Sequence, residues 1–238
     1  MVHVAALQNS KIRNLCELAL AYILILATIW TSGRAQQVLL FTSAIWIVAT
    51  TLLLRDKLKF DGLTPLGLER SWWIVAVAAV MAAAAVAMSA QLGTLHLPLG
   101  FERQAWRAWG YITFAFVQQF ILQDYFLLRL QHLTAKARLA VAIAAVLFSL
   151  AHLPNPLLTF ATLVSGCIAC LLFLRYRDLY ALGFAHALLG LTLAFTVPNS
   201  VHHRMRVGLG YLTYRPDMHA HSAEPEPPYS VNPSVGDR

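Results

Sequence analysis

The stretch FAFVQQFILQDYFLLRLQHL, residues 114–133, decides the fold class because it is as apolar as a membrane span yet carries ionisable side chains. An α-helix needs about 20 predominantly apolar residues to cross the hydrocarbon core of a bilayer. An ionisable side chain at the centre of such a helix costs about 2.5–3.5 kcal/mol on insertion scales. Asp124 and Arg129 must therefore face a protein-lined or hydrated interior rather than lipid.

The composition of the whole chain supports a membrane protein. Hydrophobic residues make up 58% of the 238 residues and charged residues only 12%, whereas a soluble domain is about one-quarter charged. The net charge of +7 comes from basic residues between apolar segments, an arrangement typical of membrane topology and anionic headgroups. We therefore expect the lipid bilayer as a partner and no nucleic acid.

The apolar segments predict an all-α fold, a polytopic transmembrane helix bundle of about seven spans. The predicted division is N-terminal spans in 1–108, core helices in 109–197 and a proline-rich, polar, disordered C-terminal tail in 198–238. The predicted spans are 15–31, 38–54, 72–90, 109–133, 139–152, 157–174 and 179–197.

Two further predicted spans each carry one histidine within the membrane. His152 lies in LFSLAHLP and His186 in LGFAHALLG. With a rise of about 1.5 Å per helical residue, both lie well inside the bilayer, as does Asp124, and helix tilt can close the remaining differences in depth. The sequence therefore predicts that one carboxylate and two imidazoles converge in the interior.

Structural interpretations of these polar residues stay open. A lone histidine in a membrane can simply hydrogen-bond a neighbouring helix, and the pair of Asp124 and Arg129 can hold two helices together. Gln118 and Gln119 fit interhelical hydrogen bonding, and Tyr125 fits a packing role with a satisfied hydroxyl. The presence of all three main groups in one interior favours a functional site.

The pattern resembles the CPBP intramembrane protease family, which includes type II CAAX prenyl endopeptidase-like and bacteriocin-processing proteins. That family has EExxxR, FxxxH and HxxxN motifs on successive helices. Here DYFLLR (124–129), FSLAH (148–152) and HALLG (186–190) occupy these places, and the resemblance covers 109–197. The motifs are degenerate.

The departures from the family pattern concern three positions. Asp124 is one methylene shorter than glutamate, Tyr125 supplies a hydroxyl but no charge, and Gly190 supplies no side chain. The residues that match unchanged are Arg129, Phe148, His152 and His186.

The resemblance implies an intramembrane endopeptidase that hydrolyses a peptide bond of a membrane-embedded, lipid-anchored or prenylated substrate. Its candidate catalytic residues are Asp124, Arg129, His152 and His186. Asp124 would be the general base, and the two histidines would position water or stabilise the oxyanion. Two imidazoles and a carboxylate also fit a catalytic zinc site, so metal use stays open, although we expect no tightly bound zinc. The expected location is a bacterial inner membrane.

Three alternatives remain at this point. A catalytically degenerate relative, acting as a membrane scaffold or immunity-like binding protein, is favoured by Tyr125 and Gly190. A haem protein could use His152 and His186 as axial ligands, and a proton-coupled transporter could use Asp124 as a relay.

Overall fold

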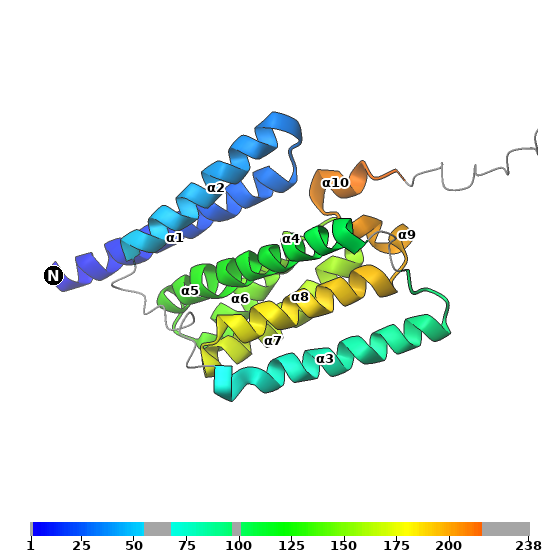
Figure 1. Ribbon diagram of the computed structural model, residues 1–238. Coiled ribbons are helices and arrows are strands. Elements are labelled where there is room, and N and C mark those ends of the chain that lie inside the picture. Colours follow the sequence, from blue (N-terminus) through cyan, green and yellow to red (C-terminus); the bar gives the residue numbers. More distant parts are fainter. Residues whose placement is uncertain (1, 55–67, 97–100, 216–238) are drawn as a thin grey trace, which may run out of the picture.

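The structure, a computed structural model, describes residues 2–54, 68–96 and 101–215. Every regular element in these ranges is a helix, which confirms the predicted all-α fold (Figure 1). The helices are α1 (Val2–Ile29), α2 (Gly33–Leu54), α3 (Leu68–Gln91), α4 (Phe101–Phe120), the π-helix η3 (Ile121–Leu127), α5 (Leu128–Leu133), α6 (Ala137–Leu150), α7 (Pro156–Tyr176), α8 (Leu179–Thr196), α9 (Asn199–His202), the 3-10 helix η4 (His203–Met205) and α10 (Gly208–Leu212).

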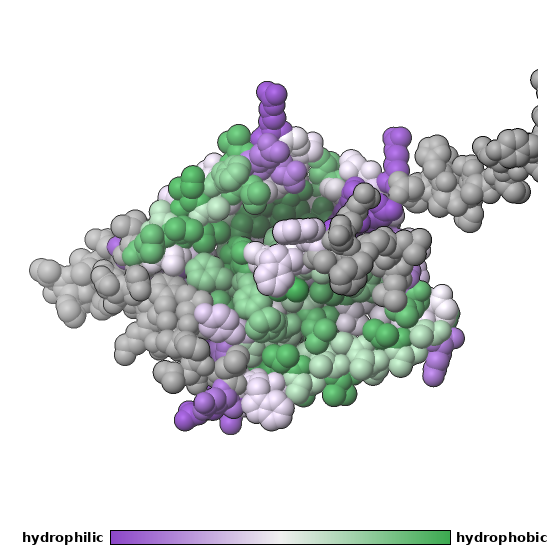
Figure 2. All heavy atoms as spheres, viewed as in Figure 1, coloured by the Kyte–Doolittle hydropathy of each residue, from purple (hydrophilic) through white to green (hydrophobic). Residues whose placement is uncertain are grey.

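The bundle has the length and surface of an integral membrane protein. Five helices, α1, α2, α3, α7 and α8, are long and apolar enough to cross a membrane. The predicted span 139–152 corresponds to the shorter helix α6, and 109–133 corresponds to α4, η3 and α5 in succession. Large apolar side chains such as Phe41, Val80 and Phe160 are exposed. In Figure 2 the hydrophilic residues gather near the helix ends, which suits helices that span a lipid bilayer.

The helices form two parts, a hairpin of α1 and α2 and a more compact group of α3 to α8 (Figure 1). Within the second part, α3 and α4 both pack against α8, and α6 packs against α7. Gly183 allows the close contact of α4 and α8, because a Cβ there would overlap the ring of Phe116. Small residues at such positions are how membrane helices approach one another.

Polar caps fix the ends of the core helices. Asn155 accepts a hydrogen bond from the Leu158 N–H at the start of α7. Asp178 accepts hydrogen bonds from two backbone N–H groups at the start of α8 and from the Ser71 hydroxyl of α3. The Asp178 carboxylate thus caps the start of α8 and also binds the neighbouring helix α3.

The segment after the last span differs from the prediction of a disordered tail over 198–238. It continues as α9, η4 and α10, and the rest of the predicted tail, 216–238, lies outside the described residues. The amide of Asn155 donates to the carbonyl oxygens of His202 and Arg206, at 2.9 and 3.1 Å. The buried Asn155 amide and the buried His202 therefore give this polar segment hydrogen-bond partners that its composition alone does not predict.

Candidate intramembrane active site

A cavity of about 840 Å³ lies between the α1–α2 hairpin and the core helices. Residues of α1, α2, α3, α4, η3, α6, α7 and α8 line it, and most of them are aliphatic or aromatic. Figure 2 shows the surface hollowed between the two parts of the bundle. The few polar groups in this apolar space include His152, His186 and Gln118. A large apolar cavity with a few convergent polar groups is the usual form of a ligand-binding or catalytic site.

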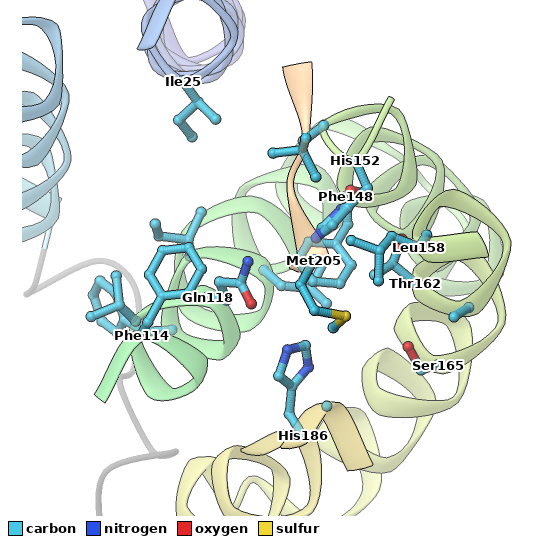
Figure 3. Close-up of a pocket in the computed structure, with 18 of the residues that line it drawn as sticks. Ile25, Phe114, Gln118, Phe148, His152, Leu158, Thr162, Ser165, His186 and Met205 are labelled. Carbon is cyan, nitrogen blue, oxygen red and sulfur yellow. Dashed lines mark hydrogen bonds between the residues drawn. The ribbon is translucent and has the colours of Figure 1, made fainter. Parts of the chain in front are cut away.

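The two histidines predicted as site residues both line this cavity. His152 follows the end of α6 and His186 lies on α8, and they enter from opposite sides (Figure 3). The ring of Phe148 lies against both, with centroids 4.9 Å from His152 and 6.1 Å from His186. The i, i+4 spacing of the FSLAH motif places its phenylalanine beside its histidine, and the fold brings in the second imidazole.

The hydrogen bond of His152 fixes which ring nitrogen carries its proton. Its Nδ1 lies 2.7 Å from the carbonyl oxygen of Phe148. A carbonyl only accepts, so Nδ1 is the donor and the neutral ring keeps a lone pair on Nε2. His152 therefore has a basic nitrogen that its backbone partner leaves unused.

His186 has the opposite arrangement. Its Nδ1 lies 3.0 Å from the amide nitrogen of Gln119, and the Gln119 oxygen accepts a hydrogen bond from Gln123 at 3.1 Å. An amide nitrogen only donates, so Nδ1 accepts and the proton of the neutral ring is on Nε2. The two imidazoles thus differ in what they can offer at Nε2, one a lone pair and the other an N–H.

Asp124 does not belong to the cavity lining. It lies in η3, fully buried, and neither carboxylate oxygen has a hydrogen-bond partner among the described residues. Arg177, at the end of α7, lies close enough to interact with it electrostatically. The structure therefore brings the two predicted histidines together and places the predicted carboxylate outside the space that they share.

Arg129 lies in a separate polar cluster beside α1 and α2. Its guanidinium donates to the backbone oxygens of Tyr125 and Thr50, both at 3.2 Å, and lies 3.5 Å from the Glu17 carboxylate. It also lies over the Tyr125 ring, 3.8 Å from the centroid. The Tyr125 hydroxyl is 3.0 Å from that of Thr50. These two motif residues thus connect the core to the hairpin.

Tyr111 is a cavity residue that the sequence analysis missed. Its hydroxyl lies where a side chain on Gly190 would begin, and a Cβ there would overlap it. Both residues line the cavity. The position that lacks the family's asparagine therefore receives a hydroxyl from α4. A tyrosine outside every motif gives no signal in the sequence for this role.

The C-terminal segment supplies another cavity residue, Met205. Figure 3 shows its side chain in the space between His152 and His186. The backbone of Met205 and of the two residues before it has left-handed φ angles of 48 to 59°, which non-glycine residues rarely adopt. The sequence analysis missed this contact because it assigned the segment to a disordered tail.

The donor set does not fit the zinc site considered from the sequence. Within the described ranges, no group of three His, Cys, Asp or Glu residues lies close enough to hold a metal ion. The third protein ligand of such a site would have to be a carboxylate, and Asp124 is not in the cavity lining. Two histidines in an apolar cavity remain.

The fold and this cavity define a polytopic membrane protein with a histidine pair enclosed among its helices. Residues 102–192 match the family described as type II CAAX prenyl endopeptidase Rce1-like. This match confirms the resemblance to the CPBP family over residues 102–192, which are fewer than half of the 238 residues. The description of that family specifies a prenyl endopeptidase activity. Comparison with curated proteins gave no match, and comparison with solved structures gave none.

Proposed function

We propose that this protein is an intramembrane endopeptidase that cleaves its substrate in the cavity between the α1–α2 hairpin and the core helices. The observation that carries this proposal is the pair of cavity-lining imidazoles, His152 and His186, whose Nδ1 atoms are both engaged. One ring offers a base and the other an N–H donor at Nε2. Peptide hydrolysis needs both kinds of group.

In the proposed reaction, His152 acts on water. Its Nε2 removes a proton as the water oxygen attacks the scissile carbonyl carbon. When the C–N bond breaks, His152 returns that proton to the leaving amine, so the ring ends the cycle neutral. General acid–base catalysis of this kind contributes about 10²–10⁴-fold to a rate.

His186 stabilises the charge that develops on the carbonyl oxygen. Its Nε2–H donates a hydrogen bond to the oxyanion, and the apolar lining of the cavity strengthens that interaction. The Tyr111 hydroxyl, which replaces the missing Gly190 side chain, supplies another polar group in the same cavity.

Asp124, which the family resemblance makes the general base, remains a competing candidate for that role. The position of His152 in the cavity lining favours His152 instead. A comparison of Asp124→Asn with His152→Ala distinguishes them, because only loss of the true base removes the water-activating step. We expect the larger loss of kcat in His152→Ala.

The substrate that fits this cavity is a membrane-embedded or lipid-anchored peptide. The lining is mostly aliphatic and aromatic, with Ile25, Phe114 and Leu189 among its members. A prenyl group, as in the substrates that the family name specifies, would lie against such side chains. The bacterial inner membrane as the location stays a prediction.

The test uses full-length protein in lipid vesicles with a farnesylated CAAX peptide, and mass spectrometry to detect cleavage. Wild type should release a C-terminal fragment, and His152→Ala and His186→Ala should not. His132→Ala, a change at an exposed histidine on α5, serves as the matched control and should cleave normally. Equal processing by wild type and His152→Ala would contradict the proposal.

A catalytically degenerate scaffold or immunity-like binding protein is the second candidate function. The observation that favours it is the engagement of Tyr125, in the place of the family's second glutamate, in contacts with Thr50 and Glu17. Such a protein would bind the farnesylated peptide in the same vesicles, with no fragment released by wild type.

A further inference from the structure

Gln119 of α4 lies between two other polar side chains, the half-buried His186 and the buried Gln123. Its amide nitrogen is 3.0 Å from His186 Nδ1, and its amide oxygen accepts from the Gln123 nitrogen at 3.1 Å. Gln119 is 2% exposed and Gln123 is fully buried. Gln123 also lies beside the Cys170 thiol of α7. The three side chains therefore form a chain of contacts from α7 to the cavity.

The order of this chain gives it a direction. With the Gln123 nitrogen donating to the Gln119 oxygen, the Gln119 amide turns its nitrogen towards His186. An amide nitrogen has protons and no available lone pair, so it cannot accept a hydrogen bond from Nδ1. The neutral His186 ring must then carry its single proton on Nε2.

We propose that Gln119 is a positioning residue that holds His186 in the Nε2–H form and thereby makes it a hydrogen-bond donor in the cavity. The catalytic role of this proton rests on the proposed peptidase function. The position of the proton on His186 does not depend on that function. His152, with Nδ1 bound to the Phe148 carbonyl, takes the other form. The partners of two chemically identical rings thus assign them opposite roles.

The role of Gln119 goes beyond helix packing. A packing glutamine could be replaced by any side chain of similar shape, whereas this one acts through the direction of its hydrogen bond. Substitution by glutamate keeps the shape, and its ionised carboxylate presents only acceptors to Nδ1. The Gln123 nitrogen can still donate to a carboxylate oxygen, so the remaining contact is preserved. The His186 proton should then move from Nε2 to Nδ1.

The experiment is ¹⁵N NMR of histidine-labelled, full-length protein in lipid nanodiscs at about pH 8.5, where an ordinary histidine, with a pKa of about 6.5, is neutral. The His186 signals are assigned by their loss in His186→Gln. In wild type, Nδ1 should have the chemical shift of an unprotonated nitrogen and Nε2 that of a protonated one. In Gln119→Glu the two assignments should exchange.

Gln118→Glu is the matched control for the tautomer. Gln118 is the neighbouring residue on α4 and lines the cavity, so it receives the same chemical change one position away. The His186 proton should stay on Nε2 in this variant. Exchange in both variants would show that added charge, rather than the Gln119 contact, moves the proton, and would overturn the proposal.

Kinetics with the farnesylated peptide provide a second readout. Loss of one oxyanion donor typically lowers kcat by about 10²–10³-fold, so Gln119→Glu should lower kcat by about 100-fold with KM little changed. Gln119→Leu, which offers no partner to Nδ1, should give a mixture of both tautomers and an intermediate kcat.

The outcomes separate this inference from the proposed function. Wild-type protein with the His186 proton on Nδ1 would overturn the role of Gln119 even if His186 proves essential for cleavage. The expected tautomer exchange without any cleavage by wild type would support the role of Gln119 and contradict the peptidase. If Gln119→Glu does not fold, the wild-type spectrum and the Gln119→Leu variant still test whether Gln119 sets the position of the His186 proton.

Discussion

Two polar clusters, one around Arg129 of α5 and one around the cavity, differ in how completely their groups are satisfied. Around Arg129, the guanidinium reaches two backbone oxygens and the Glu17 carboxylate. Around the cavity, His152 and His186 each use Nδ1 for a protein partner. Their Nε2 atoms have no protein partner among the described residues. A satisfied buried network stabilises a fold, whereas a half-satisfied one in a cavity is available for a ligand.

This difference suggests distinct roles for residues that belong to different motifs of the same family. Arg129 joins the core to the hairpin that forms one wall of the cavity. We therefore propose that it supports the cavity without touching the substrate. The histidines would carry the chemistry. Variants in the two clusters should accordingly affect different measurements.

The largest expected effect is on activity, in His152→Ala. Removal of the base should lower kcat by about 10²–10⁴-fold. The variant loses one hydrogen bond to the Phe148 carbonyl of α6, so the free energy of unfolding should fall by about 1 kcal/mol or less. Peptide cleavage and thermal unfolding in detergent measure the two effects. A large fall in melting temperature together with the loss of activity would show that the role of His152 is structural.

Arg129→Met should affect stability most. The change removes the buried partner of the backbone oxygens of Thr50 and Tyr125 and leaves Glu17 with only the exposed Arg13. Breaking a buried ion pair by removing one side costs about 3–5 kcal/mol. Chemical unfolding in mixed micelles measures this loss in the free energy of unfolding.

Arg13→Met is the control for that prediction. Arg13 pairs with the same Glu17, at 3.6 Å, but its side chain is 47% exposed. Exposed pairs contribute about 0–1 kcal/mol, so this variant should remain close to wild type. Equal losses of stability in both variants would show that the burial of Arg129 does not determine the contribution of its ion pair.

Gly190→Ala should have an intermediate effect. The new methyl group would overlap the Tyr111 hydroxyl and force that ring to move within the cavity wall. Overpacking of this kind costs about 1–3 kcal/mol. Gly110→Ala, on α4 with no atom within 4 Å of an added Cβ, is the control and should be neutral or slightly stabilising. Thermal unfolding compares the two variants, and identical melting temperatures would exclude the contact.

The smallest expected effect concerns pH and the C-terminal segment. Burial lowers the pKa of His202 below its ordinary value of 6.5. The neutral ring accepts the Met205 N–H at Nδ1 and lies 2.8 Å from the Val197 oxygen through Nε2. Because the unfolded chain binds a proton more readily, stability from this group is present above about pH 6.5 and falls as the pH drops towards the lowered pKa.

The measurement for His202 is the melting temperature at pH 7.5 and at pH 5.5. Wild type should lose more stability between these values than His202→Gln, which has no proton to gain. Parallel losses in the two proteins would assign the pH dependence to other groups.

The regular features of the site follow from local spacing and were predictable. Phe148 and His152 lie four residues apart, in the last turn of α6 and in the turn that follows it, and meet for that reason. The placement of Asp124 was not predictable in this way. It lies in a π-helix, whose i→i+5 turns change the direction in which successive side chains point. The direction of the Asp124 side chain therefore cannot be predicted from the regular spacing of an ordinary α-helix.

The sequence by itself determined that this protein is a bundle of membrane helices with an Rce1-like segment, because apolar stretches in lipid must satisfy their backbone groups internally. Only the tertiary structure decided which polar groups meet. Tyr125 contacts Thr50, 75 residues away, and Tyr111 fills the space beside Gly190. Such pairings depend on the tilt and rotation of packed helices, which side-chain contacts between distant segments set and local patterns do not encode.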